Sequence, residues 1–226
     1  MANTLLLLTI LLFSFKTKSS EKIIGAAVNY VDSTYHFDTI KINDQQFIRT
    51  SKNNTFNCLT TLKGDTIIRS EEFWINNEIL DIDEDGYQDI RVFVRSSTPN
   101  QCDNYLYDKK LKTFALLDNC DLDIHKIKGT KYFYSYNSVG CSDMNWESYL
   151  SQIDNFRLTS LGYMYGQGCD FNIKENPQII SIYIITHDDN RTIIETLSYP
   201  KQIPRFEDKW HFIQRYWTEH HQKFIR

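Results

Sequence analysis

The sequence predicts an all-β protein built from antiparallel hairpins, with one helix at its C-terminus. Three observations support this prediction. Short runs of β-branched and aromatic residues recur about every 8 to 12 residues, polar turn segments separate them, and no helical pattern intervenes before the C-terminal region. These features favour a β-sandwich or a β-propeller over a fold of parallel strands with crossover helices.

The predicted strands are short, as expected for a hairpin-rich domain. Most of them alternate or cluster β-branched and aromatic side chains between turn-forming residues. The segments with this character are 22–30, 46–50, 56–62, 65–69, 90–95, 104–107, 113–117, 132–136, 148–153, 156–165, 179–186 and 192–197.

A single helix is predicted over about 205–225, after Pro204. Large apolar side chains recur there at spacings of three, four or seven, which places them on one helical face. We expect this face to cover the β core as a lid. The side chains that define the predicted face are Phe206, Trp210, Ile213, Trp217 and Phe224.

The N-terminus, residues 1–20, has the character of a secretory signal peptide. Its apolar stretch, 5–15, is too short for a helix that crosses a bilayer about 30 Å thick, which disfavours an uncleaved anchor. Ser19 and Ser20 follow it and suit cleavage. Residues 21–226 are then expected to form a single domain that is periplasmic or secreted, without a membrane span.

The net charge argues against nucleic-acid binding. The whole chain carries a formal charge of −4, and removal of Lys16 and Lys18 with the signal peptide changes it to −6. An acidic protein repels the phosphate backbone, so DNA and RNA are not expected partners. Aromatic residues make up 14% of the chain, which indicates a packed core rather than disorder.

The five cysteines all lie beyond the predicted cleavage point, as expected for a chain that folds in an oxidising compartment. Two pairs are symmetric about predicted turns, so hairpin folding would bring their sulfurs together. The predicted disulfides are Cys102–Cys120 and Cys141–Cys169, with Cys58 left free. Buried, reduced thiols are the alternative.

The acidic stretch 81–89 is the sharpest motif in the chain. Asp81, Asp83 and Asp85 stand at loop positions 1, 3 and 5, where carboxylates can converge on one hard cation. Gly86 at position 6 permits the tight turn such a loop needs. Oxygen ligands of this kind favour Ca²⁺ over zinc or copper, and Mg²⁺ resists the dehydration that the site demands.

The rest of the loop completes a five-residue ligand set. The backbone carbonyl of Tyr87 at position 7 is expected to point inward, and Asp89 at position 9 is expected to close the site, because Val92 replaces the position-12 glutamate of an EF-hand. The flanks 77–80 and 90–94 have strand character, so the loop would join two β-strands. A metal-free acidic turn is the alternative, but its carboxylates would repel one another.

The predicted role of the ion is structural, and the chain is not expected to be an enzyme. No catalytic motif for acyl, phosphoryl or hydride transfer is present. Asp143 with Glu147 has a spacing too common to indicate a glycosidase pair. The tyrosine-rich segments 132–136 and 163–166 could expose aromatic rings for recognition, although cross-strand packing explains them equally well.

Residues 78–118, which contain the acidic loop, the following Ile90-Arg91 and the segments 104–108 and 109–114, resemble a known family. The resemblance is to small exported calcium-binding proteins related to the xanthomonad type IV secretion immunity protein, which is lysozyme-inhibitor-like. It implies a β-propeller-like fold of about five blades with one calcium site. It also implies a periplasmic location and inhibition of a peptidoglycan glycohydrolase.

Two functions of different classes follow from these observations. The first is an exported calcium-binding protein whose protein partner is a lysozyme-like glycohydrolase, which it inhibits as an inhibitor or immunity factor. The second is a surface carbohydrate-binding or adhesion module that uses exposed tyrosines.

Overall fold

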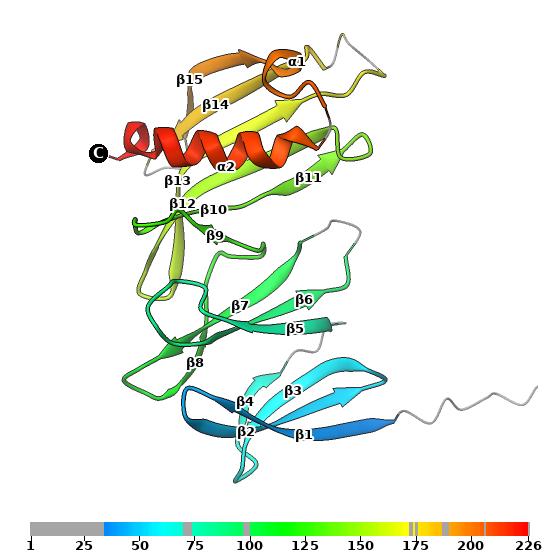
Figure 1. The fold of residues 1–226 in the computed structure, drawn as a ribbon, viewed down its shortest axis with the longest axis vertical. Coiled ribbons are helices and arrows are strands. Elements are labelled where there is room, and N and C mark those ends of the chain that lie inside the picture. Colours follow the sequence, from blue (N-terminus) through cyan, green and yellow to red (C-terminus); the bar gives the residue numbers. More distant parts are fainter. Residues whose placement is uncertain are drawn as a thin grey trace, which may run out of the picture. The chain divides into compact units, whose positions relative to one another are not determined.

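The computed structural model describes residues 34–69, 74–96, 100–171, 174, 176–186, 190–205 and 207–225. Within these residues the strands form three antiparallel sheets that follow one another along the chain (Figure 1). The all-β class is therefore confirmed. The predicted signal peptide and the strand at 22–30 lie outside the described residues.

The first sheet is a meander in the order β1-β2-β3-β4. Two-residue turns, Asn43-Asp44 and Asn53-Asn54, join its first three strands. All four turn residues have left-handed φ angles, between 50° and 63°, the conformation that matches the twist of a tight hairpin and that Asn and Asp tolerate. The strand bounds are β1 (Tyr35–Ile42), β2 (Gln45–Lys52), β3 (Thr55–Thr61) and β4 (Thr66–Arg69).

The second sheet is also a meander, in the order β5-β6-β7-β8. Its buried side chains join those of the first sheet in one hydrophobic cluster, which includes Phe47, Leu59 and Ile68 from the first sheet and Val92 and Phe114 from the second. The two sheets therefore share a core. The bounds are β5 (Trp74–Leu80), β6 (Asp89–Val94), β7 (Cys102–Asp108) and β8 (Thr113–Leu116).

The third sheet has seven strands, in the order β15-β14-β13-β12-β10-β9, with β11 also paired to β12. Its two longest strands, β12 and β13, have 10 and 11 residues, and each pairs with neighbouring strands on both sides. The five blades expected from the resemblance are not found in the described chain, because β9 to β15 all extend this one sheet. The bounds are β9 (His125–Lys126), β10 (Tyr132–Tyr134), β11 (Asn137–Gly140), β12 (Asn145–Asp154), β13 (Arg157–Gln167), β14 (Ile179–Ile185) and β15 (Arg191–Ser198).

The C-terminal helix α2 (Asp208–His220) lies across the third sheet (Figure 1). A short helix α1 (Tyr199–Gln202) precedes it and a 3₁₀ turn η1 (His221–Phe224) follows it. Trp217 is fully buried, and its indole Nε1 donates a 2.8 Å hydrogen bond to Ser148 Oγ of β12. The helix is thus fixed to the sheet by packing and by a satisfied buried polar pair.

The buried face of α2 differs from the predicted one at Trp210, whose side chain is 43% exposed. The neighbouring Lys209 is fully buried instead, and its ammonium donates to the Asp143 carboxylate and backbone carbonyl. Ile213, Trp217 and Phe224 are buried as predicted, and Phe206 lies outside the described residues. None of the described helices combines the length and apolar character needed to cross a membrane.

The disulfide Cys141–Cys169 is confirmed, with its Cα atoms 5.8 Å apart, and Cys58 is free as predicted. The predicted Cys102–Cys120 disulfide is wrong: both residues are buried thiols. Asn104 Nδ2 lies 3.5 Å from the Cys102 sulfur and 3.2 Å from the Cys120 sulfur, so the amide is held against both sulfurs. Burial raises the pKa of each thiol to about 12, which makes them unreactive.

Counting thiols separates the two disulfide arrangements. We expect iodoacetamide, applied under denaturing conditions without reductant, to modify three cysteines, because only Cys141 and Cys169 are bridged. The measurement is intact mass followed by peptide mapping. After reduction, all five cysteines should react. A single modified cysteine, Cys58, before reduction would show that Cys102 and Cys120 are also joined.

Gly166 on β13 lies directly opposite the buried Trp146 of β12. A Cβ atom at Gly166 would sit 2.2 Å from the indole, so Gly166→Ala forces the ring to move. We expect the substitution to lower the free energy of unfolding by about 1–3 kcal/mol, as overpacking does. Urea denaturation measures this change. Thr159→Ala, at an exposed position on the same strand, should change it by less than about 0.5 kcal/mol, and equal effects would contradict the packing argument.

Candidate metal site

The acidic loop connects β5 to β6 and begins and ends at a strand pair, Leu80 opposite Asp89. Because the two strands are hydrogen-bonded at this point, residues 81–88 must reverse the chain within a small space. Glu84 and Gly86 allow this with left-handed φ angles of 52° and 90°. The loop therefore places several of its side chains on the inside of a tight bend.

Three carboxylates meet inside this bend. One oxygen from each of Asp81, Asp83 and Asp89 lies within 4.8 Å of the others. Asp81 is exposed, Asp83 is half-buried and Asp89 is almost completely buried. We call these three residues the acidic triad. Hard oxygen atoms at such spacing fit the coordination shell of Ca²⁺, whose ligands lie about 2.3–2.6 Å from the ion.

Asp89 is also a structural residue. Its Oδ2 accepts a 2.8 Å hydrogen bond from the Ile82 backbone N–H, and its Oδ1 accepts one of the same length from the Tyr107 backbone N–H. The carboxylate therefore ties the start of the loop to β7. Both of its oxygens are oriented by these amides, which fixes the inner wall of the triad.

Asp85 and Tyr87, which the sequence predicts as ligands, are placed differently from the triad. The Asp85 backbone N–H donates to Asp81 Oδ1 at 3.0 Å, while the Asp85 carboxylate forms a 2.8 Å ion pair with Lys109. The Tyr87 ring stacks on Tyr107, with 5.4 Å between the ring centroids, and the Lys109 ammonium lies 4.6 Å from the Tyr87 centroid. Ligation through the Tyr87 carbonyl stays a prediction.

Residues far from the loop in the sequence contact it, and the sequence alone does not reveal these contacts. The Lys126 ammonium donates to the backbone carbonyl of Asp83 and lies 3.9 Å from the Glu84 carboxylate. From the first sheet, the Asn43 side chain exchanges two 2.7 Å hydrogen bonds with the backbone of Gln88. No local pattern could identify these partners, because Asn43 and Lys126 are each more than forty residues away from the atoms they contact.

The raised pKa values of Asp83 and Asp89 indicate that the negative charge around them is incompletely compensated. Burial raises the pKa of Asp89 to about 7, although the two amide hydrogen bonds oppose this shift. Burial, together with the charges of Asp85 and Asp81, also raises the pKa of Asp83. A divalent cation would supply the missing positive charge and favour the ionised carboxylates. The donor set therefore fits Ca²⁺.

The other sequence candidates have separate partners. Asp143 pairs with Lys209, whereas Glu147 accepts a 3.0 Å hydrogen bond from Tyr163 Oη, so each carboxylate has its own partner. Tyr132 and Tyr163 are buried, and the tyrosine-rich segments therefore serve mainly in packing. The exposed tyrosines expected in those segments are not found there among the described residues.

Comparison with known proteins shows a distant structural likeness but no family. No family model matches the chain, and no curated protein matches it. The chain is similar in structure to a Xanthomonas type IV secretion system related protein, with a TM-score of 0.43 and 13% sequence identity. The match covers 71% of this chain and 87% of that one.

Proposed function

We propose that this protein is an exported binding protein that holds one structural Ca²⁺ in its acidic loop and inhibits a peptidoglycan glycohydrolase. The convergence of Asp81, Asp83 and Asp89 within 4.8 Å carries the metal part of the proposal. The disulfide Cys141–Cys169 fits a protein that is exported to an oxidising compartment.

The ion would act by stiffening the scaffold. Ca²⁺ takes six to eight oxygen ligands, so the triad would be supplemented by the Tyr87 carbonyl, by Asp85 and by water. Ile82 within the loop is buried in a hydrophobic cluster that also contains Leu106 and Phe133. Metal binding would therefore stabilise the loop together with β7 and β10, and a rigid surface loses less conformational entropy when it binds a partner.

The choice of target depends on the resemblance of residues 78–118 to the exported inhibitor family. A protein that acts by blocking an enzyme needs a shaped surface and no catalytic residues of its own. We therefore propose that the chain acts by binding rather than by catalysis.

Calcium should raise the thermal stability of the protein. At a free concentration of 100 times the Kd, mass action adds about 2.7 kcal/mol to the free energy of unfolding. Asp83→Asn removes one triad charge and should weaken calcium binding at least about tenfold, which corresponds to a loss of about 1.4 kcal/mol of binding free energy. Differential scanning fluorimetry with calcium and with a chelator, together with calorimetric titration, measures both effects.

Glu84→Gln is the matched control, because it removes the same charge from an exposed neighbour that is outside the triad. Its calcium affinity should stay within about twofold of the unsubstituted protein. The metal assignment fails if neither calcium nor the chelator changes the melting temperature of the unsubstituted protein. It also fails if Glu84→Gln loses as much affinity as Asp83→Asn.

Inhibition is tested with the calcium-loaded protein and a panel of lysozyme-type muramidases. We expect a stoichiometric excess of the protein to slow hydrolysis of peptidoglycan by at least one panel member. Asp83→Asn, assayed at the same calcium concentration, should inhibit less because its loop is less ordered. If no muramidase is slowed while the calcium-dependent melt persists, the target is wrong and the metal site stands.

A further inference from the structure

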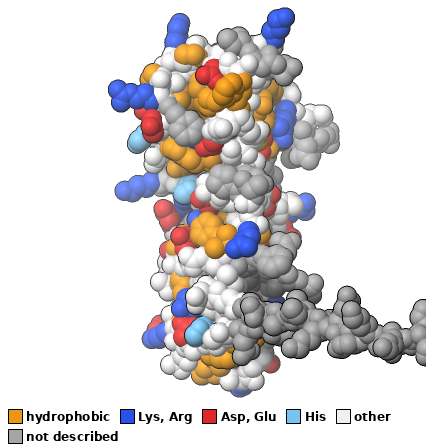
Figure 2. All heavy atoms as spheres, turned by 90° about the vertical axis from the view of Figure 1, so that its right-hand side faces the viewer, with side chains coloured by type: hydrophobic (Ala, Val, Ile, Leu, Met, Phe, Trp, Pro, Cys, Tyr) orange, Lys and Arg blue, Asp and Glu red, His pale blue; other side chains and the backbone are white. Residues whose placement is uncertain are grey.

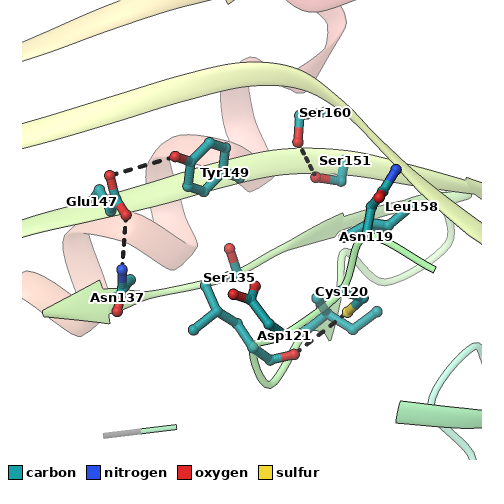
Figure 3. A pocket seen from close by; sticks show the side chains of 12 residues that line it. Asn119, Cys120, Asp121, Ser135, Asn137, Glu147, Tyr149, Ser151, Leu158 and Ser160 are labelled. Carbon is teal, nitrogen blue, oxygen red and sulfur yellow. Dashed lines mark hydrogen bonds between the residues drawn. The ribbon is translucent and has the colours of Figure 1, made fainter. Parts of the chain in front are cut away.

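The third sheet has one face that α2 does not cover. Along β12, Trp146, Ser148 and Leu150 point toward the helix, where Trp217 contacts Ser148. Strand alternation therefore turns Glu147, Tyr149 and Ser151 to the opposite face. There, a cavity of about 230 Å³ lies between the sheet and the segment 119–124 (Figure 3).

Polar side chains dominate the cavity wall. Ser151 and Ser160 lie side by side, with 3.4 Å between their hydroxyl oxygens, and Asp121 lies across from them (Figure 3). Glu147 and Asn137 form another part of the wall. Small-molecule sites combine such convergent polar groups with a few apolar surfaces, which here include Leu122 and Leu158.

Glu147 is held in place by its neighbours. Its Oε1 accepts a 2.8 Å hydrogen bond from Asn137 Nδ2, and its Oε2 accepts one from Tyr163 Oη at 3.0 Å and a longer one from Tyr149 Oη at 3.4 Å. A carboxylate has about four acceptor positions, so Glu147 keeps capacity for a further donor. The wall is thus preorganised by interactions among its own residues.

Asn137 has a buried acceptor with no protein partner. Because its Nδ2 donates to Glu147, its Oδ1 must face the other way, and no described residue donates to this atom. An unsatisfied buried carbonyl is unfavourable. Because this atom is almost fully shielded from solvent, a donor held in the cavity reaches it only after the Asn137 side chain shifts.

We propose that this cavity binds a neutral sugar ring. The free capacity of its charged side chains consists of acceptors, on Asp121 and Glu147, so a ligand rich in O–H donors suits it. The ring of Tyr149 provides an aromatic wall against which the C–H face of a sugar can pack. The cavity volume suits one ring rather than a long chain.

The charges around the cavity exclude acidic sugars. Two carboxylates and no lysine, arginine or histidine are among the described lining residues. Two arginines lie nearby but are occupied. The Arg191 guanidinium stacks on the Tyr163 ring at 3.9 Å and donates to Tyr149 Oη at 3.3 Å. The Arg157 guanidinium donates to the Asn119 side-chain amide at 3.0 Å. A uronic acid would therefore be repelled, whereas a neutral hexose or N-acetylhexosamine would not.

The site is independent of the calcium proposal and of the muramidase target. It also differs from the tyrosine surface that the sequence suggests, because Asp121, Asn137 and Glu147 provide its chemistry rather than exposed rings. The occupant that it predicts is a single neutral sugar unit, free or at the end of a glycan.

The test is an NMR titration of the isotope-labelled protein with glucose, N-acetylglucosamine and glucuronate. We expect at least one of the two neutral sugars to bind with a Kd on the order of 1 mM and to shift the amide signals of Asn137 and Tyr149. Glucuronate should bind at least about tenfold more weakly. The proposal is overturned if neither neutral sugar shifts these signals at about 50 mM, roughly fifty times that Kd.

Two variants locate the binding. Asp121→Ala should lower the affinity for the neutral sugar at least about threefold, since Asp121 is an exposed residue that lines the cavity. Ser160→Val fills part of the cavity and should lower the same affinity at least about tenfold. Asp118→Ala and Thr159→Val, exposed neighbours that do not line the cavity, are the controls. Equal affinity in all four variants, with folded spectra, would place the sugar elsewhere and reject the site.

Discussion

The buried carboxylate of Asp89 is the contact on which the architecture of the middle of the chain depends. It begins β6 and accepts backbone N–H groups from the loop before it and from β7 beside it. An aspartate is required here because one short side chain must satisfy two amides in different directions. Its burial raises its pKa to about 7, so the same residue that organises the loop also favours a positive charge near it.

The acidic loop is linked to the third sheet through Ile82. This side chain is buried with Cys120, Ile124 and Phe133, and Phe133 belongs to β10 of that sheet. Cys120 and Ile124 in turn line the cavity. Order in the loop and the shape of the cavity wall therefore share one hydrophobic cluster. Close packing in such a cluster transmits small displacements, since interiors have few voids to absorb them.

Hairpin geometry brings both predicted cysteine pairs close together, but only one pair is bridged. The β12–β13 ladder ends where Asn145 faces Gln167, and Cys141 and Cys169 lie just beyond it, where the Gly168 N–H donates to the Met144 carbonyl. Cys102 and Cys120 also lie beyond their ladder, and the Cys102 N–H donates to the Asp121 carbonyl. The sulfurs of this second pair instead face the Asn104 amide, at 3.5 Å and 3.2 Å. A symmetric spacing therefore predicts that two cysteines approach each other, and their surroundings in the fold decide whether they are bridged.

Features built from neighbouring residues could be predicted from the sequence, whereas features built from distant segments could not. Most strands with dense β-branched and aromatic residues are found close to their predicted positions, but β1 is not predicted, because only Ile42 among its residues is buried and periodicity is weak. The triad carboxylates could be predicted because they belong to one loop. The cavity could not, since Asp121, Asn137 and Ser160 come together only through sheet pairing and a returning segment.

The two lysines beside the acidic loop bear on whether the triad is a cation site or an internally neutralised turn. Lys109 pairs with Asp85, the aspartate outside the triad, and Lys126 donates to the Asp83 backbone carbonyl rather than to its carboxylate. Among the described residues, no ion pair involves a triad carboxylate. The lysines therefore reduce repulsion at the edge of the loop without forming an ion pair with a triad carboxylate. This arrangement limits the cost of assembling three carboxylates before an ion binds, without a side-chain ammonium competing for its position.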